Sequence, residues 1–208
     1  MKTAIVGYPR IGAHRELKFA SEQYFRGACT EAELQETAKS LRLANLTQQK
    51  ESGLDWIPSN DFSFYDGMLD TAFLLNAVPK RYRELGLAPL DTYFAAARGY
   101  QGDKGDVKAL AMKKWFNTNY HYMVPELEDD TVICLADEKP FHLYQEAKAA
   151  GVETKPVVIG AYTFLKLAVY NGKKTAADFV ADTVKAYADL LQSSRPSALL
   201  GYSSMNLA

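Results

Sequence analysis

The stretch that decides the fold class is TAIVGYPRIGAHRELK, residues 3–18. Residues 3–8 are mostly apolar and predict a short buried strand. Residues 9–14 contain proline and glycine and predict a turn, and residues 15–18 open a helix. In α/β proteins, the carboxyl end of a strand and the free N–H groups of the next helix converge on one spot, which is a common anion-binding arrangement. The segment therefore predicts an α/β protein with an anion site near its first strand.

The rest of the chain alternates apolar runs with helical patterns, which is typical of a parallel α/β architecture. Thr30 and Glu33 form a capping box for a helix that ends near residues 52–53. Further helices are expected within 61–98 (two or three), at 138–150 and at 175–192. Further strands are expected at 55–60, in the second half of 113–125, at 155–160 and at 198–202.

Three of these segments carry more specific expectations. Pro58 lacks a backbone donor, so its strand must lie at a sheet edge or end early. Residues 99–107 predict a mobile loop, and residues 129–140 predict a variable connection. In the helix at 175–192 the apolar side chains fall on one stripe, which predicts an amphipathic helix; they are Ala176, Phe179, Val180, Val184, Tyr187 and Leu191.

Four or five βα units amount to about half of an eight-stranded barrel, which needs roughly 250 residues. An open sheet with exposed edges is the alternative. We therefore predict an α/β fold that is a partial (βα)8 TIM-type barrel. Residues 1–192 would form this incomplete barrel, and residues 193–208 an atypical tail. Uncovered strand edges lead us to expect self-association.

Composition narrows the class of protein. The 208 residues include 24 basic and 25 acidic side chains, a balance that argues against a dedicated nucleic-acid binder. No apolar run reaches the roughly 18 residues of a membrane span. The first residues do not resemble a signal peptide. The two cysteines, Cys29 and Cys134, are too few for a disulfide framework and indicate reduced thiols in a cytoplasmic protein.

A basic group at the first helix start, Arg10, Arg15 and Lys18, is the first candidate site. The plain alternative is a solvated helix end. Cations at a helix N-terminus oppose the macrodipole by roughly 0.3–1 kcal/mol each, so an anionic partner would explain them. Glu16 neutralises part of this charge.

Two other polar segments are candidates. Residues 55–66 follow a strand and would face a barrel site, or would simply cap the next helix through Ser59, Asn60 or Asp61. In 113–121, extended backbone would place Asn117, Asn119 and His121 on the face opposite the aromatic residues. That face would suit a flat heteroaromatic ligand, while the alternative is a buried strand with satisfied amides.

Metal chemistry has little support. His14, His121 and His142 are far apart in the sequence, and no zinc-ligand spacing occurs. No phosphate-binding glycine motif and no nucleophile elbow occurs either. The residues alone indicate an incomplete anion-binding α/β domain, with no catalytic residue and no metal ligand assigned.

Four blocks make a resemblance specific: GYPRIGAHRELK (7–18), IPSNDFSFYD (57–66), KWFNTNYHY (114–122) and KPVVIGAYTFL (155–165). In this order and spacing they resemble the amino-terminal domain of cobalamin-independent methionine synthase, over about residues 3–192. The family has proline where this chain has Ala161. Residues 193–208 do not resemble the family's next strand.

The resemblance implies methyl transfer from 5-methyltetrahydrofolate polyglutamate to homocysteine by a protein of two facing (βα)8 barrels. It implies folate contacts from Arg15, Glu16, Leu17 and Lys18, and from Lys114. It places the zinc ion on the carboxyl-terminal barrel, so no cofactor is expected on this chain. The chain would then be a truncated, inactive part of the synthase that needs the remainder as partner. A stand-alone folate-polyglutamate binding module and a non-catalytic remnant are the alternatives.

Overall fold

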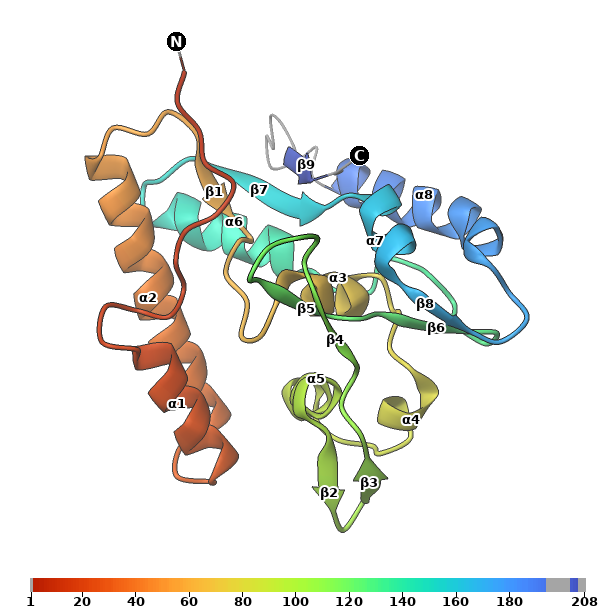
Figure 1. Ribbon diagram of the computed structural model, residues 1–208. Helices are drawn as coiled ribbons and strands as arrows, with labels where there is room; N and C mark the ends of the chain where they lie inside the picture. Colours follow the sequence, from red (N-terminus) through yellow and green to blue (C-terminus); the bar gives the residue numbers. More distant parts are fainter. Residues whose placement is uncertain (1, 194–202, 206–208) are drawn as a thin grey trace. The chain divides into compact units, whose positions relative to one another are not determined.

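A computed structural model of the chain describes residues 2–193 and 203–205 (Figure 1). Within this part, residues 2–64 and 139–157 form one compact unit, and residues 65–138 and 158–193 form a second. Each unit has its own buried apolar residues.

The first unit begins with two helices that pack on each other, α1 (Glu16–Phe25) and α2 (Glu31–Glu51). The predicted capping box is present: Glu33 N donates to the Thr30 hydroxyl, and Thr30 N donates to the Glu33 carboxylate. Leu17 of α1 is buried together with Ala38 of α2 and Phe62. The two helices and the segment after the first strand thus share one small core.

A parallel strand pair completes the first unit. β1 (Ile57–Ser59) pairs with β7 (Thr154–Ile159), with Ile57 opposite Thr154, and the three-stranded sheet has the order β1-β7-β9, with β9 at Ser203–Met205. β1 is short and lies at the end of that order, as Pro58 predicted. Helix α6 (Lys139–Ala149) packs near β1, and a bidentate ion pair of 2.7 and 2.8 Å joins Arg42 of α2 to Glu146 of α6.

The strand predicted at residues 3–8 is reduced to a single bridge, between Ala4 and Trp56. Past the bridge the backbone is held by side chains instead: the Asp61 carboxylate accepts a 2.8 Å hydrogen bond from Tyr8 N. Val6 is more than half exposed, so no apolar face draws this segment into a sheet.

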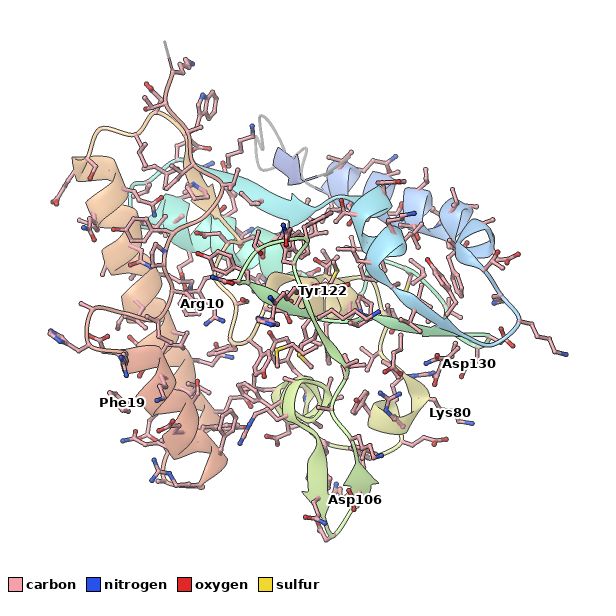
Figure 2. All side chains as sticks on the ribbon, viewed as in Figure 1. Arg10, Phe19, Lys80, Asp106, Tyr122 and Asp130 are labelled. Atoms are coloured by element: carbon pink, nitrogen blue, oxygen red, sulfur yellow. The ribbon has the colours of Figure 1, made fainter. Side chains whose placement is uncertain are left out.

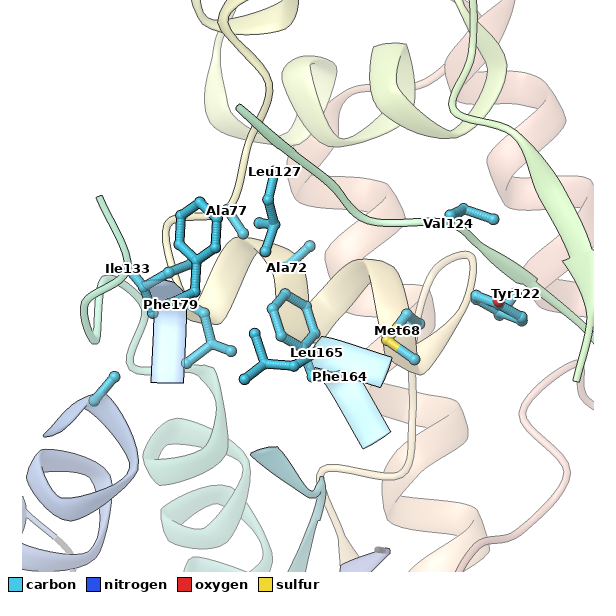
Figure 3. Packing of buried hydrophobic residues seen from close by; sticks show 12 residues of the cluster. Met68, Ala72, Ala77, Tyr122, Val124, Leu127, Ile133, Phe164, Leu165 and Phe179 are labelled. Carbon is cyan, nitrogen blue, oxygen red and sulfur yellow. The ribbon is translucent and has the colours of Figure 1, made fainter. Parts of the chain in front are cut away.

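The second unit contains three helices within residues 65–98, as predicted: α3 (Gly67–Leu74), α4 (Lys80–Arg83) and α5 (Pro89–Arg98). Strands β6 (Glu126–Glu128) and β8 (Val169–Asn171) pair in parallel. Helix α7 (Ala161–Leu167) precedes β8 in the chain, and helix α8 (Ala176–Ser193) follows it. Figure 3 shows the hydrophobic core of this unit, in which Met68, Leu127, Phe164 and Phe179 are buried.

Several local predictions in this unit were wrong. Residues 99–107 are not a loop but an antiparallel hairpin of β2 (Tyr100–Gly102) and β3 (Gly105–Val107). The strand expected in the second half of 113–125 is present as β5 (His121–Met123), but it pairs with an unpredicted strand, β4 (Met112–Lys114), in a hairpin. The elements β6, α7 and β8 were not predicted, since each is too short to show a periodic pattern.

The observed architecture is mixed α/β. In the described residues the strands form four separate small sheets and do not close into a barrel. The strand expected at 198–202 lies outside the described residues, as does most of the predicted tail. None of the helices in residues 2–193 is both long and apolar enough to cross a membrane.

Candidate functional site

A tight turn sets the start of α1. Gly12 has a φ of 83°, and a Cβ there would lie 2.0 Å from a Glu16 carboxylate oxygen and 2.9 Å from Leu41 Cδ2. Arg15 N donates to the Gly12 carbonyl at 3.3 Å, and Leu17 N donates to the Ile11 carbonyl at 3.2 Å. The left-handed φ favours glycine, and an added Cβ would displace the Glu16 carboxylate and the Leu41 methyl group, so the turn fixes where the basic residues enter the helix.

Arg15 and Lys18 present cationic groups at this helix start. Arg15 is the N-cap residue, has a left-handed φ of 64° and makes no side-chain cap. Lys18 has a side chain 49% exposed, and its Nζ lies 3.7 Å from Glu22. An exposed pair of this kind contributes little, so the ammonium group can turn to another anion. The structure places both cations on the surface.

Glu16 and Leu17 serve the turn and the core. The Glu16 carboxylate accepts a 3.0 Å hydrogen bond from His14 N. Backbone N–H groups, first that of Glu16 itself and then that of His14, lower the pKa of this carboxyl. The Leu17 side chain is buried in the α1–α2 core, so a ligand at this position would meet backbone rather than the leucine side chain.

Lys114 and His121 face each other across the β4–β5 hairpin. They are direct partners in the antiparallel register, and both are exposed. Directly opposed residues share one face of a strand pair. Lys113 is paired with Tyr122, and Tyr122 is buried (Figure 2). Lys114 and His121 therefore form a polar face, while the neighbouring pair lies on the other face.

The tip of the hairpin is built by residues 115–120. Trp115 N donates to the Tyr120 carbonyl at 2.7 Å, and the Thr118 hydroxyl donates to the Trp115 carbonyl at 2.6 Å. Asn117 and Asn119 lie in this turn, so they do not alternate with aromatic residues along a strand as predicted. Phe116 is 48% exposed and Tyr120 is 79% exposed, which leaves two flat aromatic surfaces beside the amides.

The two groups of site residues belong to different units. Arg15, Glu16, Leu17 and Lys18 lie in the first, and Lys114, Asn117, Asn119 and His121 lie in the second.

Sequence reasoning missed the roles of two carboxylates in the block at 57–66. Asp66, rather than Ser59, Asn60 or Asp61, is the N-cap of α3. Asp61 instead holds Tyr8 N, and burial raises the pKa of its carboxyl even though that hydrogen bond acts in the opposite direction. The polar residues were visible in the sequence, but their partners are more than fifty residues away or on the next helix.

One cavity of the first unit is too small for a cofactor. It has a volume of about 20 Å³ and lies among residues of α2, β1, the segment after β1, and α6. That volume suits about one water molecule, whereas ligand pockets run to roughly 300–1,000 Å³. Gln49 Oε1 and Asn60 Oδ1, from residues that line the cavity, are buried acceptors without a partner in the described structure.

No group of three or more His, Cys, Asp or Glu side chains in the described residues is arranged to hold a metal ion. Cys29 and Cys134 are free thiols, as predicted.

The chain matches the model of the family described as "Cobalamin-independent synthase, N-terminal domain" over residues 2–198. It is 54% identical over 190 residues to the 5-methyltetrahydropteroyltriglutamate–homocysteine methyltransferases of Campylobacter jejuni subsp. doylei and Streptococcus thermophilus. It is 53% identical over 192 residues to the enzyme of that name from Lactococcus lactis. These matches cover 91–92% of this chain.

Each match covers 25% of the relative, so the chain spans about a quarter of the length of the curated relatives it matches. The family match extends over nearly all of the chain and includes the first helix start, the 57–66 block and the β4–β5 hairpin. The chain belongs to the cobalamin-independent synthase family, in which it corresponds to the N-terminal domain.

Proposed function

We propose that this chain is the folate-binding part of a methionine synthase that transfers a methyl group from 5-methyltetrahydrofolate polyglutamate to homocysteine. The identity of 54% to relatives that carry this methyltransferase name is the observation that supports the proposal most. In the whole protein, the matched segment would belong to a (βα)8 barrel that works in the cytoplasm. The rest of the synthase would be its partner.

Exposed cations are the groups that would recognise the glutamate tail. A triglutamate carries several carboxylates, and each exposed Lys or Arg contributes roughly 0.2–1 kcal/mol to binding one of them. Arg15 adds more if its guanidinium binds a carboxylate through two parallel hydrogen bonds. Lys18 is only weakly paired with Glu22, and Lys114 is exposed opposite His121. These observations support both lysines as contacts of the glutamate tail.

The hairpin tip would contact the pterin. Phe116 and Tyr120 offer exposed rings, and Asn117 and Asn119 supply amide donors and acceptors next to them. A flat heteroaromatic ring with hydrogen-bonding edges needs this combination.

Methyl transfer also requires a homocysteine thiolate, because the thiolate is the nucleophilic form of a thiol. In this proposal the zinc that stabilises the thiolate is held by the part of the synthase beyond the matched segment. The residues of this chain bind and orient the methyl donor.

Calorimetric titration with 5-methyltetrahydropteroyltriglutamate tests the binding role. We expect Lys18→Ala and Lys114→Ala each to weaken binding by about two- to fivefold, as the loss of one exposed ion pair predicts. The loss should shrink with the monoglutamate and at high salt, since screening weakens exposed charge pairs.

Two lysines are matched controls. Lys185 lies 3.4 Å from Asp189 in the same i,i+4 arrangement as Lys18 and Glu22. Lys113 is on the same strand as Lys114 but faces Tyr122. Lys185→Ala and Lys113→Ala should leave affinity unchanged. Equal losses in tests and controls would contradict the assigned contacts, and the absence of any binding would contradict the folate role.

A further inference from the structure

Asp61 is a carboxylate that neither the cap of α3 nor the proposed folate contacts account for. It follows β1 directly after Asn60, in the polar block at 57–66. Its side chain is partly buried, and its carboxylate accepts a 2.8 Å hydrogen bond from Tyr8 N. A Cβ built on Gly7 would lie 3.7 Å from Asp61 Cβ, an ordinary van der Waals distance. Asp61 therefore contacts and binds the backbone of the N-terminal segment.

The backbone on both sides of Asp61 is attached to other elements of the first unit. Asn60 Nδ2 donates to the Val157 carbonyl of β7 at 2.9 Å. Lys139 Nζ of α6 donates to the Phe62 carbonyl at 2.8 Å. Asn60 itself has a left-handed φ of 61°, a conformation that asparagine adopts more readily than most residues. Because its neighbours are bound to a strand and a helix, Asp61 can fix the N-terminal segment relative to both.

A second side chain binds the next residue of that segment. The segment runs alongside α2 (Figure 1), and Asn45 Nδ2 of α2 donates to the Pro9 carbonyl at 3.1 Å. Tyr8 and Pro9 are thus bound by side chains from two different elements. The residue that follows them is Arg10, the first cation of the basic group identified in the sequence.

After Arg10 the chain turns back on the start of α1. The Ile11 carbonyl accepts from Leu17 N, and the Gly12 carbonyl accepts from Arg15 N. These two bonds bring the residues after Arg10 against the first turn of α1, which also carries Lys18. The position of residues 8–9 therefore affects how the three cations of the basic group are arranged.

We propose that Asp61 is a positioning residue for the polyglutamate tail, because it fixes the segment that leads through Arg10 into the first turn of α1. This inference rests on the proposed folate-binding function. An exposed ion pair loses much of its energy to the ordering of its groups, and a segment that is ordered before binding avoids part of that cost. Loss of the Asp61 carboxylate should weaken binding of the tail more than binding of the pterin, whose proposed contacts belong to the second unit.

Calorimetry with the triglutamate and monoglutamate forms of 5-methyltetrahydrofolate tests this role. We expect Asp61→Ala to lower the ratio of the two affinities by about two- to fivefold, the loss of about one exposed ion pair. Asp61→Asn keeps an acceptor oxygen for Tyr8 N and should keep the wild-type ratio. Asn45→Ala, which removes the bond to the Pro9 carbonyl, should lower the ratio as Asp61→Ala does. All titrations are run at a temperature at which circular dichroism shows every variant to be folded.

Asp55 provides the matched control. Its carboxylate accepts a 2.7 Å hydrogen bond from Thr3 N, so Asp55→Ala also removes a bond between a carboxylate and the N-terminal backbone. This bond lies beside the Ala4–Trp56 bridge and away from residues 8–12. Asp55→Ala should leave the affinity ratio unchanged.

Hydrogen exchange gives a readout that needs no ligand. Asp61→Ala should speed exchange of the Arg15 and Leu17 amides, which bond the turn at residues 11–12, whereas Asp55→Ala should not. Unchanged exchange of these amides in Asp61→Ala would overturn the positioning role, as would an equal fall of the affinity ratio in Asp55→Ala.

The binding outcomes also separate this role from the proposed function. If the wild-type chain binds the triglutamate and Asp61→Ala keeps the wild-type ratio, the positioning role is wrong and the folate-binding function stands. If the wild-type chain binds neither form, the folate-binding function is wrong and the positioning role fails with it.

Discussion

Gly12 shows how one residue controls the candidate site. Its φ is positive, and an added Cβ would have to displace the ends of the Glu16 and Leu41 side chains. The turn that it permits lets Ile11 accept the Leu17 N–H, and so fixes the entry of Arg15 into α1. Gly27, in the turn after α1, also has a positive φ, of 68°, but nothing lies within 4 Å of a Cβ built there.

The two glycines therefore separate steric crowding from backbone strain. Gly27→Ala should cost about 1 kcal/mol of unfolding free energy, from the left-handed conformation alone. Gly12→Ala adds the clash and should cost about 2–4 kcal/mol and weaken triglutamate binding. Urea unfolding of the two variants measures the difference. Equal losses would show that the turn relaxes around an added methyl group.

At the scale of elements, Asp66 joins a helix to a hairpin. One carboxylate oxygen caps α3 by accepting from Met68 N and Leu69 N, and the other accepts from Met123 N of β5. Burial raises the pKa of this carboxyl from its ordinary 3.8 to about 6, although the three N–H donors act in the opposite direction. Asp70 nearby adds to the rise.

A raised carboxyl pKa has a definite consequence for stability. Protonated Asp66 is favoured in the folded state, so its contribution is complete below about pH 4 and is lost as the pH rises through 6. Two pKa units correspond to about 3 kcal/mol. Between pH 4 and pH 7 the unfolding free energy of the wild type should fall by about that amount relative to Asp66→Asn, measured by urea unfolding. Parallel pH profiles would rule out the effect.

The β4–β5 hairpin is the element that positions the second group of candidate site residues. Residue pairing across two three-residue strands decides that Lys114 and His121 share a face. The turn between the strands exposes Phe116 and Tyr120 and removes the alternation that an extended strand would have given. The folate contacts proposed for residues 114–121 therefore depend on the geometry of the hairpin.

At the scale of the whole molecule, the chain consists of two units with separate cores and spans about a quarter of the length of its relatives. We expect the chain alone to form no methionine from homocysteine and 5-methyltetrahydropteroyltriglutamate in the presence of zinc, because the groups proposed to hold the zinc and the thiolate lie beyond the matched segment. Methionine formation is followed chromatographically, with the full-length Streptococcus thermophilus enzyme as the positive control. Zinc-dependent turnover by the isolated chain would refute this division of labour.

Self-association, expected from the sequence, stays a prediction at this scale.

An element could be predicted from the sequence when contacts between residues close to one another in the chain determine it. Long helices with a capping residue or a periodic pattern, α2, α6 and α8, were predicted nearly to their ends because i,i+3 and i,i+4 contacts determine them. The short strands β2, β3, β4, β6 and β8 were missed, since three residues carry no readable period, whereas β5 was predicted within the second half of 113–125. Basic residues at the first helix start were identified from the same local pattern.

The sequence by itself determined the family, the α/β class, the capping box of α2 and the chemical character of the residues at 15–18 and 114–121. The tertiary structure alone decided that Leu17 faces a core, that Asp61 and Asp66 bind distant backbone, and that α8 buries Phe179 while it exposes Val184. The physical reason is that periodicity and propensity act over one or two turns of chain. Burial and long-range hydrogen bonds depend on partners that only folding brings into contact.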